Sequence, residues 1–284
     1  MLFDLQTPRR RRVVRVVFGG LALIFAISFV FLGVGTGGGG FSFSDLFGGG
    51  SSGSSASAFD DQIDAAQQRL QATPNDTAAL AQLVQLHYSA GSQDVDSNGQ
   101  LTSDGEQQLR ESADAWNKYV KLSKGNVEQT PALFALNTFD QLGTIDFEKA
   151  RTDTSTSEAL TDVNAAVNDW KTAAQAQQIL IENQPSKNAA NSYARLASYL
   201  YLAGDTQAGD QAVAKAKQNS KGSDAATIEK QLQSLKQLGQ QLQTATTQLA
   251  KQQQAAQGGG AAAGGTTGGG NPLGGLGGVG TGGL

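Results

Sequence analysis

The longest hydrophobic run in the chain, at 16–34, carries no charged residue and directly follows a cluster of arginines. Its nineteen residues, at about 1.5 Å per residue, reach the roughly 30 Å of a bilayer's hydrocarbon core, so the run predicts one membrane-spanning helix. The arginines that precede it are Arg9, Arg10, Arg11, Arg12 and Arg15. Because basic residues beside a span stay in the cytoplasm, we expect 1–15 to be cytoplasmic. The rest of the chain then lies outside the cytoplasm after a single pass through the cell membrane.

A cleaved signal peptide is the alternative interpretation of this run. The Ala-x-Ala triplet at 56–58 matches the small residues at which signal peptidase cuts. However, signal peptides have apolar regions of about 7–15 residues with the cleavage site close behind, whereas here a long Gly/Ser-rich stretch intervenes. We therefore expect the anchor to be retained.

Three windows further along the chain, at 77–91, 129–143 and 190–204, share one pattern of apolar positions. Apolar or small residues recur every three or four places and form one face of a helix. Each window ends in glycine, which predicts a helix C-terminus at that point. A second amphipathic helix is expected after each window, at 104–122, 157–183 and 206–219. The pattern therefore predicts an all-α domain of repeated helical hairpins over 59–222.

A last helix is predicted at 223–257, where apolar residues recur with a mean spacing of 3.5, the heptad period. These residues are Ile228, Leu232, Leu235, Leu238, Leu242, Ala245 and Leu249. The helix has two interpretations, a cap that covers the end of the hairpin stack or a coiled coil that makes a homo-oligomer.

Two segments have a composition that cannot build a core. Residues 35–58 are rich in glycine and serine and are expected to be a linker between the membrane and the helical domain. In 258–284, 15 of 27 residues are glycine, so little side-chain burial opposes the entropy of the chain. We expect this tail to be disordered.

Composition excludes several function classes. After the first fifteen residues the chain holds 16 basic and 24 acidic side chains, which disfavours nucleic-acid binding. The basic N-terminus is expected to attract anionic membrane lipid. The absence of cysteine excludes disulfides and thiolate chemistry. Because no catalytic motif and no pair of buried-looking carboxylates is visible, we expect no enzyme activity and no cofactor.

Short motifs around the windows resemble the tetratricopeptide repeat family. They are Pro74-Asn75-Asp76, Gln184 to Asn188, Gly204-Asp205, and Ala173 followed twelve residues later by Pro185. The resemblance covers 59–220 and implies a solenoid of helical hairpins. The sequence departs from the family in window spacing, which is 52 and 61 residues rather than 34, and in the family's tryptophan, replaced by Leu80, Ala132 and Tyr193.

The resemblance also implies a binding surface, because in this family the first helix of each hairpin lines a concave face. The matching positions are Ala78, Ala81, Gln85, Tyr88, Thr130, Leu133, Asn137, Asp140, Asn191, Ala194, Ser198 and Tyr201. Small, amide and tyrosine side chains would suit a peptide segment. In the alternative interpretation, the chain's own C-terminal helix fills this face.

The layout of basic N-terminus, one span and repeat domain is similar to that of the ancillary subunit family of the bacterial secretion translocon. This similarity implies a scaffold that mediates protein–protein interaction, with another envelope protein or a translocating chain as its partner. A structural envelope protein that oligomerises and a calcium-responsive binding module are the alternative hypotheses.

The calcium hypothesis concerns the segment 94–106, where Asp94, Asp96, Asn98 and Gln100 alternate as in the first part of an EF-hand loop. The twelfth place, which should supply a bidentate carboxylate, is Gly105. The alternative is a polar turn over 97–99 followed by Thr102 as a helix cap, and we favour it over calcium.

Two tryptophans and the single histidine are the remaining candidates for chemistry. Trp116 and Trp170 occupy matching places on second helices and are predicted to pack between helices. His87 replaces an apolar residue of the window pattern, so we expect a packing residue with one ring nitrogen hydrogen-bonded.

Overall fold

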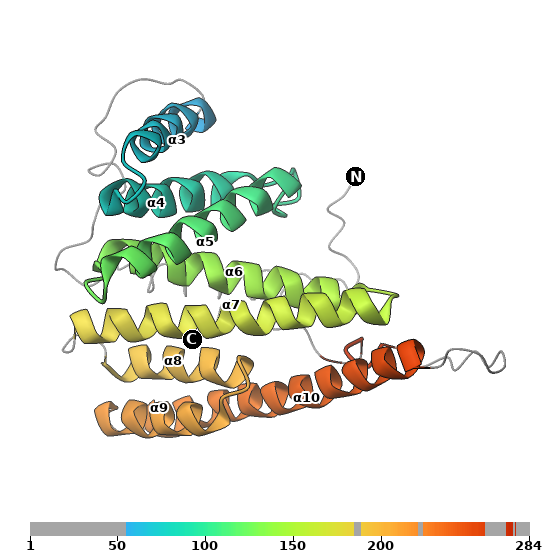
Figure 1. Cartoon of the computed structure of the whole chain (residues 1–284). Coiled ribbons are helices and arrows are strands. Elements are labelled where there is room, and N and C mark those ends of the chain that lie inside the picture. The colour runs from blue at the N-terminus through green and yellow to red at the C-terminus, as the bar shows by residue number, and fades with distance from the viewer. Residues whose placement is uncertain (1–54, 185–188, 221–223, 259–270, 275, 277–284) are drawn as a thin grey trace, which may run out of the picture. The chain divides into compact units, whose positions relative to one another are not determined.

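The structure is a computed structural model that describes residues 55–184, 189–220, 224–258, 271–274 and 276. Almost all of these residues are helical. All of these residues belong to one unit (Figure 1). Its helices are α3 (Ser55–Ala72), α4 (Thr77–Gln93), α5 (Ser103–Ser123), α6 (Gln129–Thr152), α7 (Thr156–Asn183), α8 (Ala189–Leu202), α9 (Thr206–Asn219) and α10 (Asp224–Gly258). Within these ranges the extended structure is limited to an isolated antiparallel bridge between Val95 and Leu101. The predicted all-α class is confirmed.

Several predictions fall outside the described residues. The basic segment 1–15 with its arginines, the hydrophobic run 16–34 and most of the linker 35–58 are among them. Among the helices that are described, none has the length and apolar character needed to cross a membrane. The last four residues of the predicted linker belong to α3, which begins at Ser55.

Side-chain caps explain where four of the helices begin. Asp76, Thr102, Ser155 and Asp205 each accept a hydrogen bond from the backbone N–H three residues later, at donor–acceptor distances of 2.9, 3.0, 3.4 and 2.9 Å. A cap of this kind satisfies one of the unpaired amides of a first turn and contributes about 1 kcal/mol. The predicted starts of these helices are therefore correct to within one residue.

The helices pair into three hairpins, α4 with α5, α6 with α7, and α8 with α9. Successive hairpins pack in chain order, through α5 and α4 on α6 and then through α7 on α8 (Figure 1). Helix α3 packs on α4, beside the first hairpin. The hairpin stack that the repeated windows predict is present.

Two of the three predicted helix ends are wrong. Gly91 and Gly143 lie inside α4 and α6, and α6 continues to Thr152. Both glycines allow a close approach between helices, since a Cβ at Gly91 would lie 2.7 Å from the Gly105 carbonyl oxygen. Gly204, by contrast, has φ +82° and follows the end of α8 as predicted.

The interpretation of the tryptophans and the histidine as packing residues is confirmed. Trp116 and Trp170 are both buried, and the Trp170 ring lies 5.9 Å from the ring of Phe147 between centroids. His87 is buried as well, with Nδ1 2.7 Å from Gln108 Oε1.

Helix α10 packs against α7, α8 and α9 of its own chain. Leu232, Leu242 and Leu249 on its apolar face are almost completely buried. Gly239 lies so close to the Tyr201 carbonyl that a side chain there would collide with it. These contacts favour the capping interpretation, because a coiled coil would need the same leucines.

The prediction of a wholly disordered tail is wrong for one short segment. Residues 271–274 form a turn, and Leu273 is fully buried. The high glycine content of the tail gave no indication of this segment. Its contacts are made by three consecutive non-glycine residues, Asn271, Pro272 and Leu273.

Candidate docking sites on the helical body

The predicted concave-face residues fall into two groups in the structure. On α4 and α6, Ala78, Thr130 and Leu133 are exposed, while Ala81, Gln85, Tyr88, Asn137 and Asp140 are half-buried. On α8, Asn191 is exposed, whereas Ala194, Ser198 and Tyr201 are buried. The structure therefore leaves the first two hairpins open at these positions and closes the third.

Tyr201 shows what closes the third hairpin. Its ring is 3% exposed, and its hydroxyl donates to Asp210 Oδ1 on α9 at 2.7 Å. Gly209 on α9 and Gly239 on α10 both lie against it. Lys236 of α10 binds Asp210 at 2.7 Å and lies 5.9 Å from the Tyr201 ring centroid. For this hairpin, α10 covers the predicted face, as in the alternative interpretation.

Side chains also join the second and third hairpins across this face. Arg195 of α8 donates through Nη2 to Asn137 Oδ1 of α6 at 3.2 Å and through Nε to the Tyr199 hydroxyl at 3.1 Å. On the first hairpin, the Tyr88 ring packs against Phe134 with centroids 5.5 Å apart, and burial raises the pKa of the Tyr88 hydroxyl. These two predicted contact residues, Asn137 and Tyr88, therefore already serve packing between helices.

An open groove of about 710 Å³ lies between α7 and α8. Its walls are Lys171, Ala174, Gln175, Gln178 and Ile179 from α7, and Leu196, Leu200, Ala203, Gly204 and Asp205 from α8 and the turn after it. Half of these residues are aliphatic, and the exposed amides Gln175 and Gln178 stand at its edge. Sequence reasoning missed this groove, because it forms where one hairpin meets the next.

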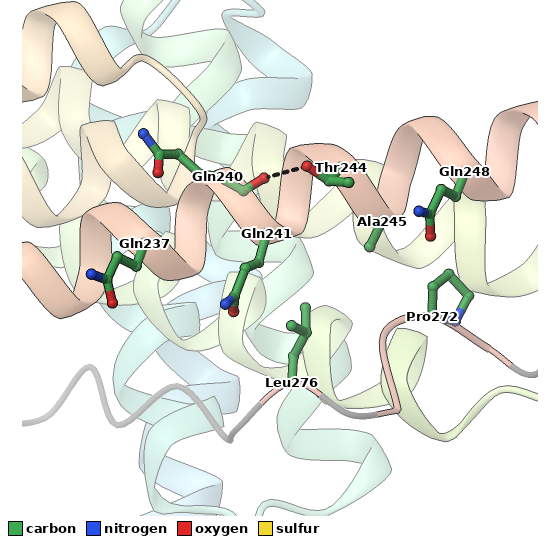
Figure 2. A pocket seen from close by; sticks show the side chains of 8 residues that line it. All are labelled: Gln237, Gln240, Gln241, Thr244, Ala245, Gln248, Pro272 and Leu276. Atoms are coloured by element: carbon green, nitrogen blue, oxygen red, sulfur yellow. Dashed lines mark hydrogen bonds between the residues drawn. The ribbon is translucent and has the colours of Figure 1, made fainter.

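A second cleft, of about 380 Å³, lies between α10 and the tail segment (Figure 2). Gln237, Gln240, Gln241, Thr244, Ala245 and Gln248 line it from α10, and Pro272 and Leu276 line it from the tail. Figure 2 shows Gln237, Gln241 and Gln248 on the side of α10 that faces Pro272 and Leu276, whereas Gln240 points to the other side of the helix. In the sequence, the feature that could have indicated this cleft is the recurrence of glutamine along 237–248.

The candidate calcium loop is closed by its own backbone. The Asp96 carboxylate accepts from the amides of Gln100 and Asn98 at 2.9 and 2.8 Å, and these bonds lower its pKa. Gly99 has φ +76°, and Thr102 caps α5, so the predicted turn and cap are confirmed. Of the other three predicted ligands, Asp94 carries a carboxylate, whereas Asn98 and Gln100 are neutral amides. In the described part of the chain, no group of three or more His, Cys, Asp or Glu side chains is arranged to hold a metal.

A buried carboxylate with a half-buried carboxylate beside it does occur, contrary to the sequence-based expectation. Asp146 of α6 is 2% exposed and binds Arg110 of α5 at 2.6 Å, while Glu106 binds both Arg110 and Lys149. Burial and the neighbouring Asp146 raise the pKa of Asp169 on α7 to about 7. The pair went unnoticed because the two aspartates lie on different helices. The network joins α5, α6 and α7, and its ion pairs hold these helices together.

No protein-family model, no curated protein and no solved structure matches this chain. The resemblance to the tetratricopeptide repeat family therefore rests on the short motifs and on the hairpin pattern. Function has to be argued from the surfaces of the helical body.

Proposed function

We propose that this chain is a membrane-anchored scaffold of helical hairpins that binds a segment of another protein. The observation that carries the proposal is the open groove between α7 and α8. Its volume of about 710 Å³ falls within the range of roughly 300–1,000 Å³ that is typical of ligand-binding pockets. Several residues of an extended or helical peptide would fit.

The chemistry of the groove supports a peptide as ligand. Ile179, Leu196 and Leu200 offer apolar surface for side chains of a partner. Gln175 and Gln178 offer amides that can both donate to and accept from a peptide backbone. The walls hold one cationic and one anionic side chain, Lys171 and Asp205, so the groove has no strong preference for charge.

The setting of the scaffold is proposed from the sequence. The hydrophobic run 16–34 and its preceding arginines support an anchor with the helical body outside the cytoplasm. The layout is similar to the ancillary subunit family of the secretion translocon, which supports an envelope protein or a translocating chain as partner. The short motifs support hairpins of the tetratricopeptide type.

The other two hypotheses have less support from the geometry. An oligomer formed through α10 would have to expose Leu232, Leu242 and Leu249, which the chain itself covers. A calcium-responsive loop would have to free Asp96 from two backbone amides. We therefore prefer the interaction scaffold.

Site-specific photocrosslinking in intact cells tests the proposed groove. A photoreactive amino acid at Gln175, which lines the groove, should form adducts with a partner protein that mass spectrometry can identify. Asn168 is the matched control, because it is also exposed on α7 but does not line the groove. Equal adducts from both positions would contradict the groove, and adducts only between copies of this chain would favour the structural hypothesis.

A further inference from the structure

Asn271 in the tail caps the C-terminal end of helix α6. Its Nδ2 group donates to the carbonyl oxygens of Ala150, Asp153 and Arg151 at 2.7, 3.1 and 3.4 Å. The last carbonyls of a helix have no partner within the helix, so an external donor satisfies them. The capping residue comes 121 positions after Ala150, which makes this a tertiary contact.

The residues around Asn271 form a compact turn. Asn271 Oδ1 accepts from the Leu273 amide at 3.0 Å, and the Gly274 amide donates to the Asn271 carbonyl at 3.1 Å. Asn, Pro and Gly stand at the first, second and fourth places, which are the places that a β-turn favours for them. Proline also fixes its own φ, so the turn loses little entropy on docking.

Apolar contacts hold the other side of the turn. Leu273 has no exposed surface. Pro272 and Leu276 form one wall of the cleft whose other wall is the glutamine-rich face of α10 (Figure 2). One short segment thus bridges the end of α6 and the face of α10, two elements that are far apart in the sequence.

The residues that precede the turn have a composition unsuited to specific recognition. The twelve residues at 259–270 are only glycine, alanine and threonine. They offer no large apolar or amide group, so the turn at 271–274 and Leu276 must supply the specificity.

We propose that the end of α6 and the adjoining face of α10 form a binding site for an Asn-Pro-Leu turn, and that the turn 271–274 of the same chain, together with Leu276, is its ligand. This site is separate from the groove between α7 and α8 and does not depend on the function proposed for that groove. Because twelve residues join the ligand to α10, its effective concentration is on the order of millimolar. The chain's own turn therefore fills the site whenever its dissociation constant lies below that concentration.

The chemistry of the site explains the choice of asparagine. An amide donates to the three carbonyls, whereas an aspartate of the same shape has no N–H to donate. Its negative charge would also meet the negative end of the α6 dipole. Asn271→Asp is therefore the sharpest single change, since it keeps the size of the side chain and removes recognition.

Disulfide trapping in the full chain tests the proposal. Because the chain has no native cysteine, only the introduced thiols can form a disulfide. Gln241→Cys with Leu276→Cys places one thiol on each wall of the cleft. Under mild oxidation the tryptic peptides 237–251 and 252–284 should become linked. The control is Thr246→Cys with Leu276→Cys, because Thr246 lies on α10 but does not line the cleft.

We expect the cleft pair to link about tenfold faster than the control pair, and Asn271→Asp to bring it down to the control rate. A synthetic peptide with the sequence of residues 269–278 should slow the linkage at millimolar concentration, and its Asn-to-Asp form should not. Equal rates for the two pairs, or no effect of Asn271→Asp, would overturn the proposal.

A mixture of ¹⁵N-labelled and unlabelled chains identifies the occupant. Linked peptides of a single isotope type support a ligand from the same chain. Linked peptides of mixed type would overturn that assignment and point to exchange of the tail between two copies. Circular dichroism melting of each variant separates loss of docking from loss of folding.

Discussion

Gly143 of α6 lies against the indole ring of Trp170 of α7, so that a Cβ at position 143 would stand 2.7 Å from Trp170 Nε1. At this point the absence of a side chain at position 143 lets the indole pack directly on the α6 backbone. Trp170 has no exposed surface, and Nε1 has no hydrogen-bond partner among the described residues.

Gly143→Ala should therefore destabilise the helical body by about 1–3 kcal/mol, because the added methyl overpacks a closed interface. Urea unfolding followed by circular dichroism measures the effect. In a Trp170→Phe background, where the ring is smaller, the same substitution should cost clearly less. Equal costs in both backgrounds would mean that the indole does not set the distance between these helices.

The pKa of Asp169, raised to about 7, makes stability depend on pH in an unusual direction. Because the folded protein holds this proton more tightly than the unfolded chain, stability falls as pH rises from about 4 towards 7. Its charged neighbours are Asp146, which raises the pKa, and Arg110, which lowers it. Glu106 acts in the opposite sense. Burial alone would raise its pKa, but Lys149 and Arg110 lower it, so its stabilising contribution is present above about pH 4.5 and is lost as the pH falls below that value.

Asp169→Asn should remove the fall in stability between pH 4.5 and 7 and should stabilise the protein by about 1 kcal/mol at pH 7, since an amide needs no proton. Denaturant unfolding at several pH values measures this. Asp162→Asn is the control, because Asp162 lies on the same helix and is less buried. A variant at 169 with the wild-type pH profile would contradict the assignment.

Tyr201, predicted from the sequence as a contact for a partner, is a buried core residue in the structure. Tyr201→Ala should cost about 3–5 kcal/mol through lost burial, and Tyr201→Phe about 1 kcal/mol through the lost bond to Asp210. Thermal melting of both variants checks the ranking. Tyr88, which is half-buried, should give a smaller loss on replacement by alanine. A Tyr201→Ala variant with the melting temperature of the wild type would instead favour the predicted concave binding face on α8.

The tail should contribute measurably to stability. Leu273→Ala should destabilise the body by about 2–3 kcal/mol, because a fully buried leucine leaves a cavity. Leu276→Ala, at a half-buried position two residues after the turn at 271–274, should cost less. The midpoint of urea unfolding gives the comparison. If neither substitution changes the midpoint of urea unfolding, the turn does not dock in solution.

The proposed single-pass orientation predicts protease sensitivity from one side of the membrane. Protease added to spheroplasts should digest the helical body, because the arginines before 16–34 are expected to keep the N-terminus in the cytoplasm. Immunoblotting with an antibody against the body follows the digestion. A body that survives until the membrane is permeabilised would reverse the orientation.

The sequence predicted four helix starts well because each of these boundaries has a local cause. Asp76, Thr102, Ser155 and Asp205 are caps that act within one turn, and the apolar period extends over several turns. Gly91 and Gly143 were misread because glycine serves both helix ends and close packing, and only the neighbouring helix decides which.

The sites were predicted less well, because they depend on contacts distant in sequence. The groove between α7 and α8 and the pairing of Asp146 with Asp169 appear only when helices meet. Asn271 lies in a glycine-rich tail, and its carbonyl partners give no signal of their own in a sequence.

Single helices flank the described hairpins on both sides, with α3 on α4 at the start and α10 against α7, α8 and α9 at the finish. Solenoids otherwise leave an apolar end on which a further repeat, or another molecule's repeat, can stack. Here those places are taken by the chain itself. For a further repeat to stack directly on the first or the third hairpin at these places, α3 or α10 would first have to move away.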